Sequence, residues 1–326
     1  MGAGSIETKP KKILEEIRTL ISAKEPLARA LIGGQLFFLD KALHADIEKN
    51  HSPHIWVLRA HIGTLDKLKE LFGQGDEHGT FEIVAAARNL FENIVWLKLF
   101  NLDVSYGLIF YEQLLQQQQQ NLENLIIKLE SEAALFDEFH VIDMRNVHTA
   151  FRPHEDRKEL SDEDIRTATA AHKAMTDELD EKARRSFSLY FYPAQTNSYG
   201  FQSELLRDDE IPKLRKTLAE INSHLAVFKA QRATLLPKGP SAARWNWKDR
   251  AAEVGLLDQY NFLYSYTSKL LHSTALNIIT EKSLTPSERV MMLDYIWITV
   301  EDAFREIDAF DYDGKVHIPL INLEGE

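Results

Sequence analysis

Apolar residues recur every three to four positions along most of this chain, which is the spacing of one face of an α-helix. A first stripe runs from Ile13 to Ile21, a second helix is predicted to begin at Pro26, and a third covers residues 54–72. Residues 81–100 are apolar on nearly all sides, which is typical of a central helix covered by others. Strand-like alternation is scarce, so the pattern predicts an all-α, multi-helix bundle of about eight to ten helices.

The longest predicted helix runs from Ser105 to Phe139, a segment without proline and with a single glycine near its start. It contains a glutamine run at 116–120 flanked by leucines. We interpret this run as a solvated helix face rather than a disordered tract. A long uninterrupted helix suits self-association, and twofold dimers are the commonest closed assemblies. We therefore expect a homodimer.

Capping signals place two further helices. Ser161 with Asp164 three residues later predicts a helix that continues to about Arg185. Thr285, Pro286 and Glu288 together form a stronger start signal for a last helix that ends near residue 310. Between these helices, the stretch SFSLYFYPAQTNSYGFQSE (186–204) interrupts the helical pattern and predicts an irregular aromatic loop or a short hairpin.

The polarity of successive segments suggests the domain organisation. Residues 1–80 are predicted to form an N-terminal helical segment that packs on a core of residues 81–310. The core holds a more polar insertion around 141–235, and residues 311–326 are predicted to form an extended tail.

Composition excludes several classes of function. The chain has 326 residues and no cysteine, which excludes disulfides, zinc–thiolate sites and thiol catalysis. Its net charge is −12, so binding of RNA or a nucleotide would need a local basic patch. No apolar signal-peptide region or bilayer-length apolar run is present, and we expect a cytoplasmic protein without membrane association.

The segment YNFLYSYTSKLLHS (260–273) carries the most unusual polar pattern. Tyr260, Tyr264, Ser268 and His272 lie four residues apart, which brings neighbouring side chains together on a helix. A narrow strip of this helix lacks carboxylates, which resembles a buried polar seam more than a solvated face. Two interpretations stay open, a structural network and a functional groove. The strip consists of Asn261, Ser265, Ser268 and His272.

A charged pair in the predicted central helix is a second candidate. Arg88 and Glu92 lie four residues apart within AAARNLFENIVWL, a strongly apolar segment. Burying such a pair is costly unless further partners satisfy it. Ser268 and His272 could supply those partners from a neighbouring helix, so we expect the two segments to contact one another.

These residues carry a resemblance to a known family. An ARxLxE-like motif at Arg88 and Glu92, then a tryptophan segment, then YxxxYxxxSxxxH resembles the bacterial domain-of-unknown-function family 5677 over residues 81–309. That family implies a helical fold and an intracellular bacterial protein. The chain is also loosely similar to the HEPN superfamily, whose helical members handle nucleotides or cleave RNA in toxin and defence systems.

Two functions follow from these observations. In the first, the protein is a metal-independent, RNase-like effector in defence or stress that needs no cofactor. Arg88 would stabilise phosphate charge and His272 would act as acid or base, with Glu92 and Ser268 completing the site. In the second, the protein is a non-catalytic helical interaction or scaffold protein, acting as an oligomer with a protein partner. The residues expected to bind substrate in the first are Tyr260, Tyr264, Trp245, Trp247 and Lys248.

The sequence also contains weaker constellations of polar residues. His51, His54 and His61 lack a nearby carboxylate and predict a metal site poorly. A formal Arg-x5-His match joins Arg166 to His172, but chance supplies such a match in a chain of this length. Two further groups combine charge with histidine or tryptophan: His140, Asp143, Arg145 and His148, interpreted as a charged surface or interdomain network, and Lys238, Arg244, Lys248 and Arg250 around the tryptophans.

Overall fold

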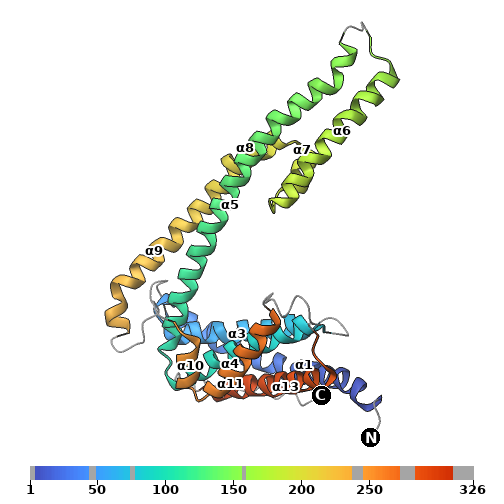
Figure 1. Ribbon diagram of the computed structural model, residues 1–326. Helices are drawn as coiled ribbons and strands as arrows, with labels where there is room; N and C mark the ends of the chain where they lie inside the picture. The colour runs from blue at the N-terminus through green and yellow to red at the C-terminus, as the bar shows by residue number, and fades with distance from the viewer. Residues whose placement is uncertain are drawn as a thin grey trace, which may run out of the picture. The chain divides into compact units, whose positions relative to one another are not determined.

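The computed structural model describes residues 4–43, 49–73, 78–155, 159–236, 245–271 and 283–310 (Figure 1). Within these ranges every regular element is helical, so the all-α prediction is confirmed. The chain divides into two units. Unit 1 comprises Met1–Gln113 and Gln231–Glu326, and unit 2 comprises Leu114–Ala230. Unit 2 overlaps most of the polar insertion that the sequence predicts at 141–235.

Unit 1 is built around α4 (Thr80–Leu102), which packs chiefly against α13 (Pro286–Ala309) and also against α11 (Leu257–Leu271) and α10 (Trp247–Glu253). The predicted central helix is therefore present. Its buried residues occur on most sides of the helix, because neighbours cover it from several directions: Ile83, Val84, Ala86, Ala87, Leu90, Phe91, Ile94, Val95, Leu97, Leu99 and Phe100.

The N-terminal part of unit 1 corrects one prediction. Residues 13–21 and the segment after Pro26 belong to a single helix, α1 (Gly4–Ala42), and Pro26 lies inside it instead of starting a second helix. Proline removes the hydrogen bond to the carbonyl four residues earlier, here that of Ser22. Both residues are exposed, so water can satisfy that carbonyl. On its other side α1 packs against α13 and α3 (Pro53–Phe72). This packing keeps the parts of α1 before and after Pro26 in one continuous helix.

The start of α5 (Tyr106–Phe151) is anchored in unit 1 at a close helix contact. A Cβ atom on Gly107 would lie 2.2 Å from the backbone oxygen of Pro53, so only glycine fits there. The ring of Tyr111 stacks on Trp56 with centroids 4.1 Å apart. One residue on, the buried Glu112 accepts a hydrogen bond of 3.0 Å from Arg232 of α9 (Ile211–Leu235).

Unit 2 contains most of α5, together with α6 (Asp162–Arg185), α7 (Phe191–Asn197), α8 (Tyr199–Leu205) and most of α9. Both α6 and α9 run antiparallel to α5 (Figure 1). Asp143 contacts His172 and Lys128 contacts Ser186, whereas Glu130 contacts Arg215 and Gln119 contacts Asn222, so residue numbers rise on one helix as they fall on the other. Short helical turns η1 (Arg152–His154) and η2 (Leu206–Glu210) follow α5 and precede α9. The buried core includes Phe136, Phe139, Leu179, Phe191, Tyr199 and Leu206.

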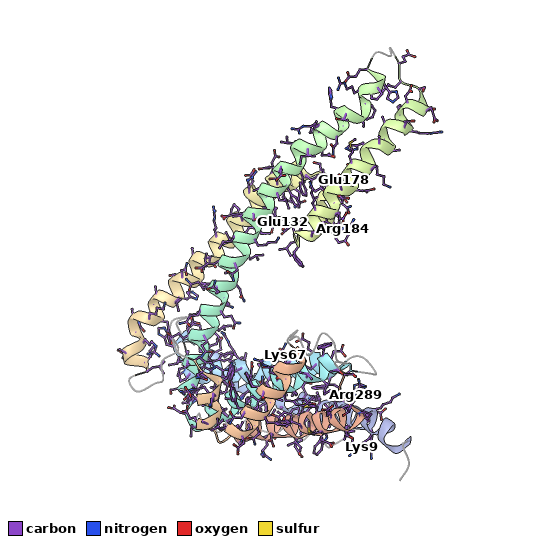
Figure 2. All side chains as sticks on the ribbon, in the orientation of Figure 1. Lys9, Lys67, Glu132, Glu178, Arg184 and Arg289 are labelled. Carbon is purple, nitrogen blue, oxygen red and sulfur yellow. The ribbon has the colours of Figure 1, made fainter. Side chains whose placement is uncertain are left out.

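The aromatic stretch at 186–204 folds differently from the loop or hairpin that its composition predicts. After a short turn it forms α7 and α8, separated by Ser198. The buried carboxylate of Glu132 (labelled in Figure 2) holds the turn by accepting hydrogen bonds from Ser188 Oγ and from the backbone N–H groups of Leu189 and Tyr190. In the same turn, Phe187 has a φ of 52° and an exposed side chain.

The predicted capping signals are confirmed at both positions. Ser161 Oγ accepts from the Asp164 N–H, and Thr285 Oγ1 accepts from the Glu288 N–H, each within a reciprocal capping box. The long predicted helix is also present, and it extends twelve residues past Phe139, to Phe151. Among the described helices, none is both long and apolar enough to cross a membrane.

Candidate functional site

The α4–α11 contact brings together three of the predicted site residues. Arg88 and Glu92 form an ion pair with 3.5 Å between Nε and Oε1, and each side chain is about a third exposed, 33% and 31%. Tyr264 of α11 donates a hydrogen bond from its hydroxyl to the same Glu92 oxygen. The Arg88 guanidinium also lies over the Tyr264 ring, 4.3 Å from its centroid. The expectation that this pair contacts the helix carrying Ser268 is therefore correct.

The electrostatics of this Arg–Glu–Tyr cluster keep the phenol protonated. Burial raises the pKa of Tyr264 well above its usual range, and the hydrogen bond to Glu92 raises it further. Arg88 opposes this shift by favouring the phenolate, but it is outweighed. Tyr264 consequently acts as a hydrogen-bond donor and not as a base, and its bond holds one oxygen of the carboxylate in place.

The remaining polar positions of α11 have different surroundings. The Tyr260 ring stacks on Tyr264 at 4.3 Å between centroids, and Ser268 is half-buried. Asn261 and Ser265 are exposed, so the expectation of a buried polar seam is wrong for this part of the strip. Their side chains are small and uncharged, yet they face solvent because α11 turns Tyr260 and Tyr264 toward Phe91 of α4. His272 lies outside the described residues.

The two predicted tryptophans belong to an aromatic cluster. Trp245 stacks on Trp96 of α4 with centroids 4.3 Å apart, and Trp247 meets both rings edge-on. Lys248 is exposed, and its backbone N–H donates to Asn246 Oδ1, the side chain that caps α10. Because its rings are stacked within the chain, this cluster anchors α10 to α4 and leaves little aromatic face for a base. Lys238 and Arg244 lie outside the described residues.

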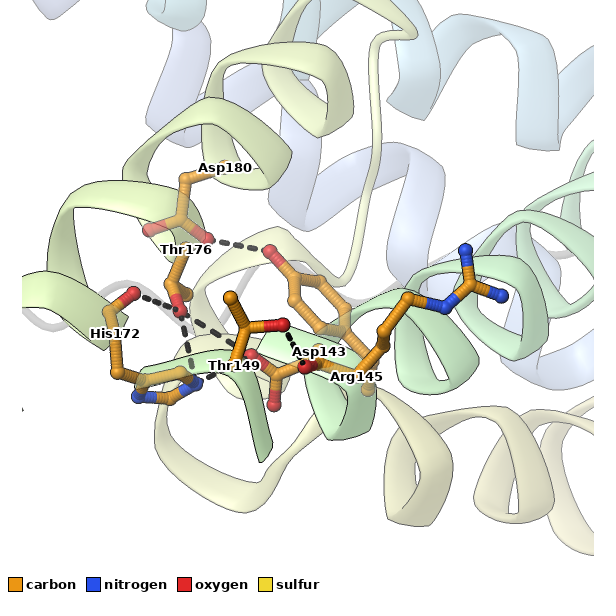
Figure 3. A network of polar contacts seen from close by, with 7 residues as sticks. Asp143, Arg145, Thr149, His172, Thr176 and Asp180 are labelled. Carbon is orange, nitrogen blue, oxygen red and sulfur yellow. Dashed lines mark hydrogen bonds and ion pairs between the residues drawn. The ribbon is translucent and has the colours of Figure 1, made fainter. Parts of the chain in front are cut away.

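A polar network in unit 2 gathers residues from the HVIDMRNVH segment (Figure 3). Asp143 of α5 contacts His172 Nε2 of α6 at 2.8 Å and accepts a 3.2 Å hydrogen bond from Thr176. Asp180 accepts from the hydroxyl of Tyr199, whose pKa is raised by burial and by that hydrogen bond. Arg145 makes no side-chain contact in this view. The network lies within unit 2, where it ties α5, α6 and α8 together.

The histidines of the weaker constellations are dispersed. His61 is buried against the rings of Phe100 and Phe310. Desolvation lowers its pKa to about 4, so it is neutral at pH 7. His148 pairs with Glu155 at the surface, 3.3 Å apart. Within the described part of the chain, no three His, Asp or Glu side chains are grouped as a metal site would need.

Unit 2 also carries two adjoining pockets that the sequence did not predict, one mainly apolar and one of mixed polarity. The first, of about 300 Å³, lies between α5 and α9, and its apolar lining is Leu122, Leu125 and Ile221. The second, of about 330 Å³, shares Leu125 and continues to Leu189 in the turn before α7. The two pockets adjoin at Leu125, and together they are here called the unit 2 groove. Its other lining residues are Gln118, Asn121, Thr217, Leu129, Tyr190, Glu210 and Leu214.

Comparison with known proteins finds no relative. No protein-family model matches the chain, and neither the curated proteins nor the solved structures give a significant match. The resemblances to family 5677 and to the HEPN superfamily therefore stay predictions.

One contact network in unit 1 could not have been selected from the sequence. Arg250 donates to the Tyr106 hydroxyl at 2.7 Å and pairs with Glu253 at 2.5 Å, while Tyr106 donates to Glu253. Burial raises the pKa of Tyr106 to about 12. The only signal in the sequence is the three-residue spacing of Arg250 and Glu253, which is too common to stand out. Tyr106 comes from a segment 144 residues away.

Proposed function

We propose that the protein is a helical interaction protein and that unit 2 binds an amphipathic helix of a protein partner. The observation that carries this proposal is the unit 2 groove, whose pocket between α5 and α9 is mainly apolar and whose adjoining pocket adds leucines beside Tyr190 and Glu210. Helices commonly bind in such grooves by placing residues three and four apart into successive apolar pockets. The two adjoining pockets of this groove, which meet at Leu125, offer that arrangement.

Exposed apolar side chains beside the groove support the same function. Phe187 is 84% exposed in the turn whose Leu189 lines the groove, and Tyr192 is 76% exposed at the start of α7. Isolated apolar side chains are normal on protein surfaces, but aromatic rings next to an apolar cleft are typical of protein interfaces. A partner helix in the groove would cover these rings at its rim.

The candidate site in unit 1 agrees with this function. The phenol of Tyr264 donates to Glu92, and its ring face is covered by Arg88. The stacked tryptophans fix α10 on α4. These contacts stabilise the helix packing of unit 1, so each group has a structural role without a substrate.

A photo-crosslinking experiment tests the proposal. A photoreactive amino acid replaces Leu122 in the groove or, as the control, Ser131, an exposed residue on the opposite side of α5. We expect a discrete crosslinked protein at position 122 that is absent at 131. The isolated partner should then bind the purified chain, and Ile221→Arg should weaken that binding at least tenfold, because it places a charge in the apolar cleft. Equal crosslinking at both positions would refute the groove as the binding surface.

A second candidate function is the RNase-like one, and one observation favours it. Arg88 and Glu92 both keep about a third of their side-chain surface accessible, so the pair is within reach of a phosphodiester. In this case purified protein should cleave RNA, and Glu92→Gln and His272→Ala should each reduce the rate by about a hundredfold or more without unfolding the chain. Wild-type protein that leaves single-stranded and structured RNA intact would reject this candidate.

A further inference from the structure

Helix α1 is apolar on two opposite faces. The inward face includes Ile17, Ile21 and Ile32, which are buried against the rest of unit 1. The outward face is also apolar between residues 20 and 38, although most of it is exposed. An exposed apolar stripe on a helix whose buried side is already packed often marks a surface for another partner. Within the described part of the chain, nothing accounts for the apolar character of the outward face.

The outward residues follow a heptad spacing. Steps of three and four residues alternate along a stripe made of Leu20, Ala23, Leu27, Ala30, Gly34 and Phe37, here called the α1 stripe. This alternation keeps a seam on one side of a helix that pairs with another helix along its length. Three of the six residues are alanine or glycine, which lets two helices approach closely.

Accessibility shows that most of the stripe is open to solvent, although Leu20 and Gly34 are half-buried. Leu27 is 62% exposed and Phe37 53% exposed, and the adjacent Leu31 and Phe38 are also exposed. A Cβ atom on Gly33, next to the stripe, would meet nothing within 4 Å. Glycine inside a helix is less stable than alanine by about 0.5–1 kcal/mol. The described chain gains no close contact from this glycine.

We propose that the α1 stripe is a self-association surface through which two copies of this chain pair, with their α1 helices antiparallel about a twofold axis. A twofold axis places the same patch against itself, so a charged patch would oppose like charges. The six positions of the stripe carry no charge, which makes it compatible with itself. This surface is separate from the unit 2 groove and does not depend on the function proposed for it.

The residue order favours the antiparallel direction. A twofold axis that crosses the outward face at the level of residue 32 places Ala30 opposite Gly34 of the second copy and Leu27 opposite its Phe37. Small residues then face small ones at the centre, and large residues fill the space on both sides. Lys41 continues the heptad beyond Phe37. A parallel pair would bring the two lysines together, whereas the antiparallel pair places each opposite the small, uncharged Ala23.

The size of the stripe sets the expected affinity. Residues 20–38 span about 27 Å of helix at 1.5 Å per residue. A single helix pair of this length lies at the low end of specific interfaces, for which about 800 Å² per partner is usual. We therefore expect a dissociation constant of about 1–100 µM, which is a weak dimer.

Light scattering on the full-length protein tests self-association. As concentration rises through this range, the mass should increase from 37.5 kDa toward twice that value. The double variant Leu27→Glu, Phe37→Glu should stay monomeric. Ile298→Glu is the matched control, because Ile298 is similarly exposed but lies on α13. This control variant should dimerise as the wild type does. A double variant that dimerises normally would overturn the proposal. The proposal would also fail if the wild type stayed monomeric and the double variant melted at a lower temperature. That result would mean that the stripe is covered by another part of the same chain.

Disulfide trapping tests the direction of pairing. The chain contains no cysteine, so each introduced thiol is unique. Ala30→Cys and Gly34→Cys proteins are prepared separately and oxidised alone or mixed. We expect a mixed disulfide well in excess of either homodimer, since only opposed residues bring their Cα atoms within about 7 Å. Homodimers in excess of the mixed species would refute the antiparallel arrangement, and failure of the unit 2 crosslinking would leave this result unchanged.

Discussion

Replacing Glu132 with glutamine should destabilise unit 2. The Glu132 carboxylate is 1% exposed and accepts three hydrogen bonds. Oε1 accepts from Ser188 Oγ at 2.6 Å and from the Tyr190 N–H at 2.7 Å, and Oε2 accepts from the Leu189 N–H at 3.0 Å. All three partners are donors, so the group must present two acceptor oxygens.

The magnitude follows from these contacts. Glutamine has only one side-chain oxygen. Its NH₂ group would therefore face either the N–H of Leu189 or the hydroxyl of Ser188 and the N–H of Tyr190. An unpaired buried donor costs about 1–3 kcal/mol, and each remaining bond to a neutral acceptor is weaker by about 1 kcal/mol than one to a carboxylate. Glutamine avoids the desolvation cost of a buried charge, which offsets part of this loss. We expect Glu132→Gln to lower the unfolding free energy of unit 2 by about 2–3 kcal/mol.

Denaturant unfolding and amide hydrogen exchange measure this effect. The N–H groups of Leu189 and Tyr190 should exchange about 30- to 150-fold faster in the variant, the ratio that corresponds to 2–3 kcal/mol. Glu138→Gln is the control, because Glu138 lies on the same helix and is exposed. Unchanged exchange at both amides, together with a wild-type midpoint, would show that the carboxylate does not hold this turn.

Three further predictions concern unit 1. Tyr264→Phe removes the bond to the α4 carboxylate and should lower the unfolding free energy by about 1–1.5 kcal/mol, whereas Tyr260→Phe, whose stacked ring is retained, should melt as the wild type does. His61 has a folded pKa of about 4, below the 6.5 of the unfolded chain, so its contribution is full above pH 6.5 and is lost as pH falls toward 4. Calorimetry should show that the unfolding free energy falls less between pH 6.5 and pH 4 in His61→Leu than in the wild type, by up to about 3 kcal/mol. Gly107→Ala would press a Cβ atom against the backbone of Pro53 and should lower the melting temperature, with a cost of about 1–3 kcal/mol; an unchanged melting temperature would show that the two helices can separate freely there.

Local signals predicted much of the helical structure. Ser161 and Thr285 start their helices where the sequence places them, because a side-chain cap acts on the backbone within three residues. The apolar character of 81–100 likewise predicted a central helix, since covering on several sides leaves no room for a polar face. Contact between the Arg88–Glu92 pair and α11 could be inferred because a charged pair among apolar residues needs partners.

Other features depended on contacts between distant residues. Pro26 is a good helix start by local criteria, but packing of α1 along α13 and α3 keeps one helix through it. The local pattern of residues 186–204 predicts an irregular segment. The turn before α7 is instead fixed by the buried Glu132, which lies more than fifty residues earlier in the chain. The unit 2 groove arises from residues on α5 and α9 that are nearly one hundred positions apart, and no local pattern identifies such a pair.

The conformation of Phe187 bears on how the chain could change by mutation. A positive φ strains any residue with a Cβ atom by about 1 kcal/mol, and glycine would remove this strain. Glycine would also remove a large apolar ring from water. Stability and solubility would therefore both improve through Phe187→Gly, so neither property explains the phenylalanine. A screen for thermostable variants should recover this substitution readily, and if the ring contacts a partner, the recovered variants should be the ones that no longer bind it.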